Sequence, residues 1–377
     1  MTEKAGLYVH LPYCRSRCGY CAFAVSTDES SRGEYLAALA AEAAIVAPEA
    51  ASERFDSLYL GGGTPSLVPD GDLEVLLDGL RSRFSFSDDA EVTLEANPED
   101  LTDEKRDAWR RAGVNRVSLG VQSFDDGELS AVGRRHDSSG AGRAIDVLAA
   151  SELSLSADLI LGLPGQTRAS FRRSLETVIA AGFGHLSIYL LETEKSRSMH
   201  EDRRAHPERY LSDEEQADSW IEAGETLADR GFHHYEISNW SRPGCEARHN
   251  IKYWTRTPTL GLGISAHELW AGRRRANVSA IPQYVSTLSE GRRPVALDQV
   301  VGEQEAAKER IVLGLRLSHG VGEKEIEAWI AGDDEDPLLA DDYRAWFEAG
   351  LLEKENGRVR FTERGFLLSN EVLCRFV

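Results

Sequence analysis

Three cysteines lie within eight consecutive positions near the start of this chain, at Cys14, Cys18 and Cys21. Three thiolates on one short loop suit a soft, thiophilic metal centre, and a cuboidal iron–sulfur cluster takes one cysteine sulfur per iron. Three ligands for four irons leave one iron with an open coordination position. At such a position a metal centre binds and activates an exchangeable molecule.

A zinc site and a disulfide are the alternatives to a cluster. Zinc loops usually pair two Cys-x2-4-Cys elements, and the two remaining cysteines, Cys245 and Cys374, are isolated in the sequence. Five cysteines in a chain of this size also do not make a disulfide framework. The cysteine pattern therefore favours an iron–sulfur cluster.

The Cys-x3-Cys-x2-Cys spacing resembles that of the radical S-adenosylmethionine (SAM) superfamily. The sequence as a whole resembles that superfamily from the first expected strand onward. In that family the open iron chelates the amino and carboxylate groups of SAM, and the reduced cluster passes an electron to the sulfonium. The resemblance therefore implies a [4Fe–4S] cluster on Cys14, Cys18 and Cys21, SAM as a second cofactor, and a partner that supplies electrons.

A glycine-rich turn, Gly61-Gly62-Gly63-Thr64-Pro65-Ser66, follows the second apolar run. Three glycines let backbone amides approach a bound group closely, although such a turn alone is as consistent with a plain turn as with a cofactor cradle. The turn is similar to one in the oxygen-independent coproporphyrinogen dehydrogenase branch of the superfamily, where it holds the SAM amino group. Polar residues after other expected strands are similar to further positions of that branch, so the resemblance implies a SAM site made by Tyr8, Tyr20, Gly62, Gly63, Thr64, Glu95, Gln122, Arg134 and Asp158.

A second candidate site is the segment His249-Asn250-x-x-Tyr253-Trp254, which we expect to be irregular in structure. From the residues alone, a packed surface histidine is the more common role. The segment is similar to the HNxxYW motif of the HemW family of heme chaperones, relatives of coproporphyrinogen dehydrogenase. Imidazole is a common axial ligand of heme iron, and flat aromatic rings pack against a porphyrin. The resemblance implies heme binding by His249, Asn250, Tyr253 and Trp254, with His249 as the axial ligand and Cys245 as a second candidate.

Six short apolar runs, each followed by a segment of helical periodicity, must position these residues. Such a series predicts a parallel sheet, and polar residues after nearly every strand favour a barrel, because all strand C-termini then face one mouth. The radical SAM resemblance implies an open, partial (β/α)6 barrel of TIM type. The expected strands are 6–12, 57–62, 91–97, 116–123, 155–163 and 185–192, and the clearest helices are 34–46, 72–84, 102–111 and 211–230.

The pattern changes near residue 301, where we expect helices at 303–317, 323–330 and 338–349, a hairpin at 351–362 turning at Glu355-Asn356-Gly357, and a last helix at 363–374. This order predicts a small winged-helix-like α+β module. We expect three parts: a barrel at 1–230, an extension with the HNxxYW segment at 231–300, and the C-terminal module at 301–377. In the dehydrogenase family a similar module covers the barrel mouth, and we expect the same position for this one.

Composition limits the partners. The 377-residue chain has a formal net charge of −20, which repels nucleic acids, and the module lacks a basic recognition stripe. The basic runs Arg273–Arg275 and Arg292–Arg293 are interpreted as solvated loop ends. No apolar run reaches the roughly twenty residues of a membrane span, and the first residues do not resemble a signal peptide. We expect a cytoplasmic protein, where clustered thiols stay reduced.

Two functions follow from the resemblance. Coproporphyrinogen dehydrogenases carry a further cysteine two positions after the third, where this chain has Phe23, and a long arm before the cluster, where 13 residues precede Cys14. Both features favour a heme chaperone that delivers heme to an as yet unidentified acceptor protein. The complete cysteine loop leaves open radical chemistry on some other substrate.

Overall fold

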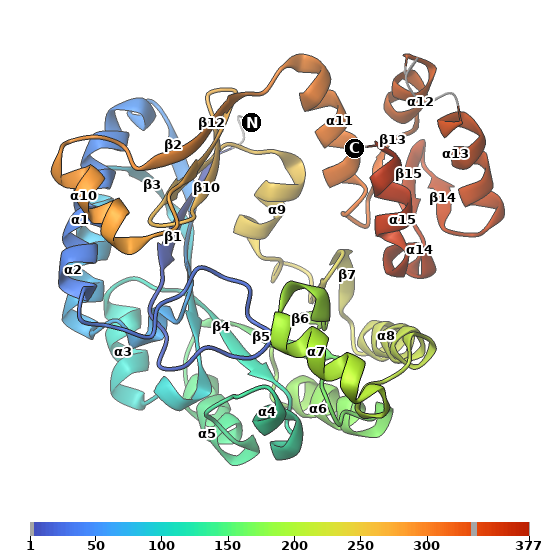
Figure 1. The fold of residues 1–377 in the computed structure, drawn as a ribbon, viewed down its shortest axis with the longest axis horizontal. Helices are drawn as coiled ribbons and strands as arrows, with labels where there is room; N and C mark the ends of the chain where they lie inside the picture. The colour runs from blue at the N-terminus through green and yellow to red at the C-terminus, as the bar shows by residue number, and fades with distance from the viewer. Residues whose placement is uncertain (1–3, 333–337, 377) are drawn as a thin grey trace.

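Six parallel strands, paired in chain order, form the centre of the molecule (Figure 1). The computed structural model describes residues 4–332 and 338–376. The apolar runs pair through their backbones while intervening helices cover the outer face, and this confirms the predicted α/β barrel. The strands are β1 (Ala5–Leu11), β2 (Arg54–Gly62), β3 (Ser85–Ala96), β4 (Arg116–Gln122), β5 (Ser154–Leu161) and β6 (His185–Leu190).

Six more strands extend this sheet at both ends. The strand order is β12-β11-β10-β9-β1-β2-β3-β4-β5-β6-β8-β7, so the sheet is open, with β12 and β7 at its two edges. β9 pairs parallel to β1, whereas β8 pairs antiparallel to β6. Residues beyond the sixth unit therefore continue the same sheet as β7 (His233–Glu236), β8 (Asn239–Ser241), β9 (Thr259–Leu262), β10 (His267–Trp270), β11 (Arg273–Asn277) and β12 (Val295–Val300).

The helices of the barrel begin where the sequence supplies side-chain caps. Thr102 accepts a hydrogen bond from the Lys105 amide, and Thr167 and Ser212 form capping boxes with Ser170 and Glu215. The apolar faces of these helices pack on the strands in one continuous core. The helices are α1 (Arg32–Val46), α2 (Asp70–Arg81), α3 (Asp103–Arg111), α4 (Asp126–Ala131), α5 (Ser138–Ala149), α6 (Arg168–Ala180), α7 (Arg197–Ala205), α8 (Asp213–Asp229), α9 (Arg248–Thr255) and α10 (Ile281–Ser289).

The interpretation of the two basic runs as solvated loop ends is wrong for Arg273–Arg275 and for Arg293, whereas Arg292 lies exposed in a loop as expected. Residues 273–275 begin strand β11, and the Arg275 guanidinium lies 2.7 Å from a carboxylate oxygen of Glu268, whose side chain is 3% exposed. Arg293 reaches the same carboxylate at 3.0 Å. Because a buried carboxylate needs a partner, the two arginines neutralise Glu268 on the outer face of the sheet.

The C-terminal module has its own hydrophobic core. Its hairpin turns at Asn356 and Gly357, whose φ angles of 52° and 73° suit a tight turn of this composition, as predicted. The predicted last helix is instead two short helices broken at Leu368. The module comprises α11 (Glu303–Gly314), β13 (Val321–Gly322), α12 (Glu323–Gly332), α13 (Leu339–Glu348), β14 (Leu352–Glu355), β15 (Arg358–Phe361), α14 (Glu363–Leu367) and α15 (Ser369–Leu373).

This module packs along the open seam of the sheet, beside α8, α9 and β7 (Figure 1). The Ile237 amide donates to the Arg316 carbonyl at 2.9 Å near the β7 edge. Toward the other edge, Glu309 of α11 pairs with Arg256 at 2.7 Å and also with Arg274. The expectation that the module covers the barrel mouth is therefore wrong, since among the described residues none after 300 lines either cavity of the mouth.

Candidate functional site

The three clustered cysteines lie on the loop between β1 and α1, and all three are free thiols. Backbone hydrogen bonds hold this loop in place: the Cys14 amide donates to the Ser26 carbonyl at 2.9 Å, and the Gly19 amide donates to the Val132 carbonyl at 3.0 Å. Burial raises the pKa of Cys14 to about 11. The loop thus presents its thiols from a fixed backbone, although it contains no helix and only an isolated bridge of sheet.

A cavity of about 430 Å³ opens beside these cysteines, at the C-terminal ends of the parallel strands. All three cysteines line it. Eight of the nine residues predicted to surround SAM also line it, namely Tyr20, Gly62, Gly63, Thr64, Glu95, Gln122, Arg134 and Asp158. Tyr8, the ninth, lines a neighbouring groove instead. Sequence reasoning missed the lining residues Asn97, Tyr189 and Lys195; Asn97 directly follows a strand end, a position that could have indicated it.

The glycine turn packs against the cysteine loop more closely than any side chain would allow. A Cβ on Gly62, whose φ is +109°, would lie 2.5 Å from the His10 ring, and one on Gly63 would lie 2.6 Å from the Pro12 carbonyl carbon. The amides of Gly62 and Gly63 donate to Glu95 at 3.0 Å and to Leu11 at 2.8 Å. Both amides are thus bonded within the protein, and the glycines allow the strand end to dock on the cysteine loop. The role of the turn in holding SAM stays a prediction.

Glu95 lies near the C-terminal end of β3, and both of its carboxylate oxygens accept hydrogen bonds. One oxygen accepts a hydrogen bond from the Tyr59 hydroxyl at 2.8 Å, and the other accepts the Gly62 amide. Burial, and to a smaller extent the neighbouring Asp158, raise the pKa of Glu95 to about 7, against the opposing effect of the hydrogen bonds from Tyr59 and Gly62. The carboxylate is thus oriented toward the cavity in an environment that favours a cationic or hydrogen-bond-donating partner.

Arg134 brings a positive charge to the cysteine loop. Its guanidinium donates to the Gly120 carbonyl at 2.6 Å and to the Asn97 side chain at 2.8 Å, and it lies 3.7 Å from the Cys18 sulfur. Gln122, at the end of β4, has a φ of 65° where the register with β5 shifts. Left-handed backbone at a non-glycine residue is uncommon, and here it coincides with the cavity wall.

The donor set of this cavity fits a cuboidal cluster. Three free thiols line one space beside an arginine cation, and Thr64 donates to the Cys14 sulfur at 3.3 Å. Within residues 4–332 and 338–376, no three His, Cys, Asp or Glu side chains are close enough to hold a single metal ion. Cysteines that each bind a different iron of one cluster are expected to be spaced in this way.

The HNxxYW segment is helix α9, not the irregular segment that we expected. Glu91, from β3, accepts the amides of Arg248 and His249, each at 3.1 Å, and so caps the first turn of the helix. Lys252 pairs with Asp56 at 2.6 Å. These contacts fix the helix against the inner face of the sheet.

His249 lies fully buried beneath this helix. Its Nδ1 hydrogen-bonds the Ser57 hydroxyl and its Nε2 hydrogen-bonds the Tyr253 hydroxyl, both at 2.9 Å, and its ring stacks on Tyr59 with 5.3 Å between ring centroids. Burial lowers the pKa of His249 to about 3, so the ring is neutral. Both ring nitrogens are therefore engaged within the protein, and an axial bond from His249 requires this packing to change.

The other motif residues point in different directions. Tyr253 is 41% exposed and lines the groove, whereas Trp254 faces the C-terminal module, with the Arg316 guanidinium 5.5 Å from its ring centroid. Asn250 is half-buried, and Cys245 lines neither cavity. Of the residues predicted to contact heme, Tyr253 alone lines the groove.

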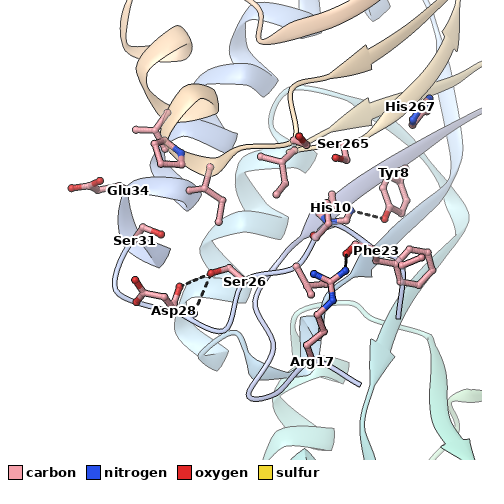
Figure 2. Close-up of a pocket in the computed structure, with 18 of the residues that line it drawn as sticks. Tyr8, His10, Arg17, Phe23, Ser26, Asp28, Ser31, Glu34, Ser265 and His267 are labelled. Atoms are coloured by element: carbon pink, nitrogen blue, oxygen red, sulfur yellow. Dashed lines mark hydrogen bonds between the residues drawn. The ribbon is translucent and has the colours of Figure 1, made fainter. Parts of the chain in front are cut away.

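This groove (Figure 2) has a volume of about 1220 Å³ and shares part of its wall with the cysteine cavity. Arg17, Ala22, Phe23 and Val25 line both spaces. Phe23, where dehydrogenases have a further cysteine, is 64% exposed. The barrel mouth therefore holds two adjoining spaces with a shared wall, one beside the thiols and one larger and partly apolar.

Comparisons with known proteins identify the family of this chain. Residues 8–178 match the family model of the radical SAM superfamily, and residues 301–368 match that of the HemN C-terminal domain. The heme chaperone HemW of Bacillus subtilis is 32% identical, with 98% of each chain covered, and that of Mycobacterium tuberculosis is 34% identical over 98% of this chain and 94% of its own. The chain belongs to the HemW family.

HemW membership agrees with the structural comparison. Coproporphyrinogen III oxidase (HemN) from Escherichia coli, described as a radical SAM enzyme, superimposes with a TM-score of 0.84 over 100% of this chain and 90% of its own, at 22% identity. At that identity the likeness shows a shared fold. Membership in the superfamily confirms the predicted [4Fe–4S] cluster and SAM as cofactors, while the residues that hold them remain predictions.

Proposed function

We propose that this protein binds heme and transfers it to an acceptor protein, with a [4Fe–4S] cluster and SAM bound beside the heme site. The near full-length similarity to chaperones of the HemW family carries this proposal. The two adjoining cavities support it, because the cysteine cavity suits a cluster and its cofactor while the groove can accommodate a larger flat ligand.

We propose a role for five residues that line the cysteine cavity. Cys14, Cys18 and Cys21 hold three irons, and the fourth iron supplies an open position for SAM. Arg134 offsets the negative charge that the thiolates bring together. Glu95, already oriented by Tyr59, accepts hydrogen bonds from the amino group of SAM. These residues bind and orient the cofactors and need no rearrangement of the strands.

The groove provides the contacts for heme. Tyr253 and Phe23 expose aromatic rings from opposite parts of the chain, and such rings pack well against a porphyrin. His249 was predicted as the axial ligand, but both of its ring nitrogens are hydrogen-bonded within the protein, to Ser57 and Tyr253, so the folded groove does not offer them to heme iron. Phe23 and Arg17 line both the groove and the cysteine cavity. A ligand in one space therefore contacts side chains that also form the wall of the other.

Coproporphyrinogen dehydrogenation is the alternative function, and the structure gives it less support. The fold is shared with HemN, but Phe23 occupies the position of the further cysteine and projects into the groove as an exposed apolar ring. A side chain without a thiol cannot provide the ligand or redox group that a cysteine would supply there. The chaperone function is therefore preferred.

The cluster, the clustered thiols and the net charge indicate which partners and which compartment this protein has. A cluster requires an electron donor, and a heme carrier requires an acceptor protein. No helix in the described parts of the chain has the length and apolar character needed to cross a bilayer. The free, clustered thiols favour a reducing compartment such as the cytoplasm, and the acidic net charge does not favour nucleic acid as a partner.

Anaerobic reconstitution with iron and sulfide, followed by two parallel assays, tests the function. We expect stoichiometric uptake of heme with a defined Soret band, transfer of that heme to an apo-hemoprotein, and no conversion of coproporphyrinogen in the presence of SAM and a reductant. Turnover of coproporphyrinogen, or failure to bind heme, contradicts the chaperone function.

A further inference from the structure

Three histidines adjoin the groove, and they differ in whether their rings are available. His10 hydrogen-bonds the Tyr8 hydroxyl at 3.1 Å and the Ala24 carbonyl at 2.8 Å, and it is 4% exposed. His249 is enclosed in the same way. His267, on β10, is exposed, lines the groove, and has no hydrogen bond from its ring to any described residue. Its nitrogens are therefore free to bind a ligand.

Strand geometry directs His267 into the groove. Successive side chains of a strand point to opposite faces. Its neighbour Glu268 points to the outer face, where Arg275 and Arg293 neutralise it, and Trp270 on that same face stacks on Phe55 with 5.9 Å between centroids. His267 must then point to the inner face, which is the face that lines the groove.

The groove around His267 has the features that a flat, dianionic ligand requires. Its volume of about 1220 Å³ exceeds the roughly 300–1,000 Å³ of a usual small-molecule pocket. Phe23 and Tyr253 offer exposed rings. One nitrogen of the Arg17 guanidinium donates to the Cys21 and Phe23 carbonyls, and its other nitrogens are suited to a carboxylate. Figure 2 shows Asp28 and Glu34 at the opposite end of the groove from His267 and Phe23, so the acidic side chains are separated from the proposed site.

We infer that His267 is an axial ligand of the heme iron, with the porphyrin lying in the groove against Phe23 and Tyr253 and a propionate near Arg17. This inference rests on the proposed heme-binding function. In this arrangement α9 contributes Tyr253 to the wall of the site, while His249 remains a packed residue that orients the Tyr253 hydroxyl.

Titration of ferric heme into the full-length protein tests the inference, with His267→Ala compared against His249→Gln. His206→Ala is the matched control, because His206 is exposed and lines neither cavity. We expect His267→Ala to lower heme affinity by about tenfold or more and to shift the Soret band, and free imidazole to restore the wild-type band. His249→Gln with unchanged circular dichroism, and the control, should keep the wild-type spectrum.

Two results overturn the inference in distinguishable ways. If wild-type protein binds heme and His267→Ala retains both its affinity and its Soret band, then His267 is not the ligand, although the chaperone function stands. If wild-type protein binds no heme at all, the proposed function itself is wrong, and the inference is wrong with it.

Discussion

Glu42 offers a sharp test of how the groove wall is held. This α1 residue is fully buried, and its carboxylate accepts hydrogen bonds from the Gly263 amide at 2.8 Å, the Asn277 side chain at 2.6 Å and the Tyr284 hydroxyl at 2.5 Å. Gly263 precedes two residues that line the groove. Burial raises the pKa of Glu42 from 4.5 to about 7, against the opposing effect of its hydrogen bonds. The folded protein therefore favours the neutral carboxyl.

The sign of the resulting pH dependence follows from linkage. A group whose pKa is higher in the folded than in the unfolded chain stabilises the fold at low pH, and that stabilisation is lost as the pH rises through the folded value. For a shift from 4.5 to about 7, the contribution of Glu42 falls by about 2.5 kcal/mol between pH 5 and pH 8. Glutamine cannot ionise, so Glu42→Gln removes this loss.

Urea unfolding at pH 5 and pH 8 measures the effect. At pH 5 we expect Glu42→Gln to be less stable than wild type by about 1–2 kcal/mol, because its amide group turns a donor toward the donors that surround Glu42. At pH 8 this deficit should disappear or reverse, a relative gain of about 2–3 kcal/mol. Glu74→Gln, at an exposed position on α2, should run parallel to wild type. A constant difference between Glu42→Gln and wild type across this pH range would refute the assigned ionisation.

Three further predictions concern the cysteine cavity. After anaerobic reconstitution, Cys14→Ser should lose most of its iron and sulfide while Cys374→Ser keeps them; a full cluster with unchanged spectra in the first variant would disprove the ligand assignment. Glu95→Ala should weaken SAM binding roughly a hundredfold in calorimetry, because a carboxylate partner is lost, and unchanged affinity would place SAM elsewhere. Gly62→Ala should lower the free energy of unfolding by about 2 kcal/mol or more, because its φ of +109° disfavours a side chain and the added Cβ would overlap the His10 ring. Urea unfolding measures the stability of Gly62→Ala against wild type. A free energy of unfolding equal to that of wild type would contradict the close packing around Gly62.

The local patterns of the sequence were enough to predict much of the site. Alternating apolar runs and helical segments predicted the six parallel strands, and parallel strands place their C-termini on one face, so Glu95, Gln122 and Asp158 were expected to converge, and the structure brings them together. The hairpin at Asn356 and Gly357 was equally predictable, since few residues adopt two successive positive φ angles. The expected α/β barrel and its small C-terminal module are both present.

Other features depend on contacts between distant segments. The strands after the sixth unit are short, and their pairing with β1 and β6 is decided by long-range hydrogen bonds that a local pattern does not encode. The basic run at Arg273–Arg275 forms a strand in the tight β10–β11 hairpin, and the second arginine that neutralises Glu268, Arg293, comes from a segment further along the chain.

The sequence by itself determined the chemistry: three thiols on one loop, a glycine turn, and a series of strands that must share one mouth. Only the tertiary structure decided which side chains are available within that mouth. His249 and His267 carry the same ring, yet Ser57, Tyr59 and Tyr253 enclose the first, whereas strand alternation turns the second into the groove. The availability of a ring nitrogen depends on burial and on hydrogen bonds from other elements, and these exist only once the chain has folded.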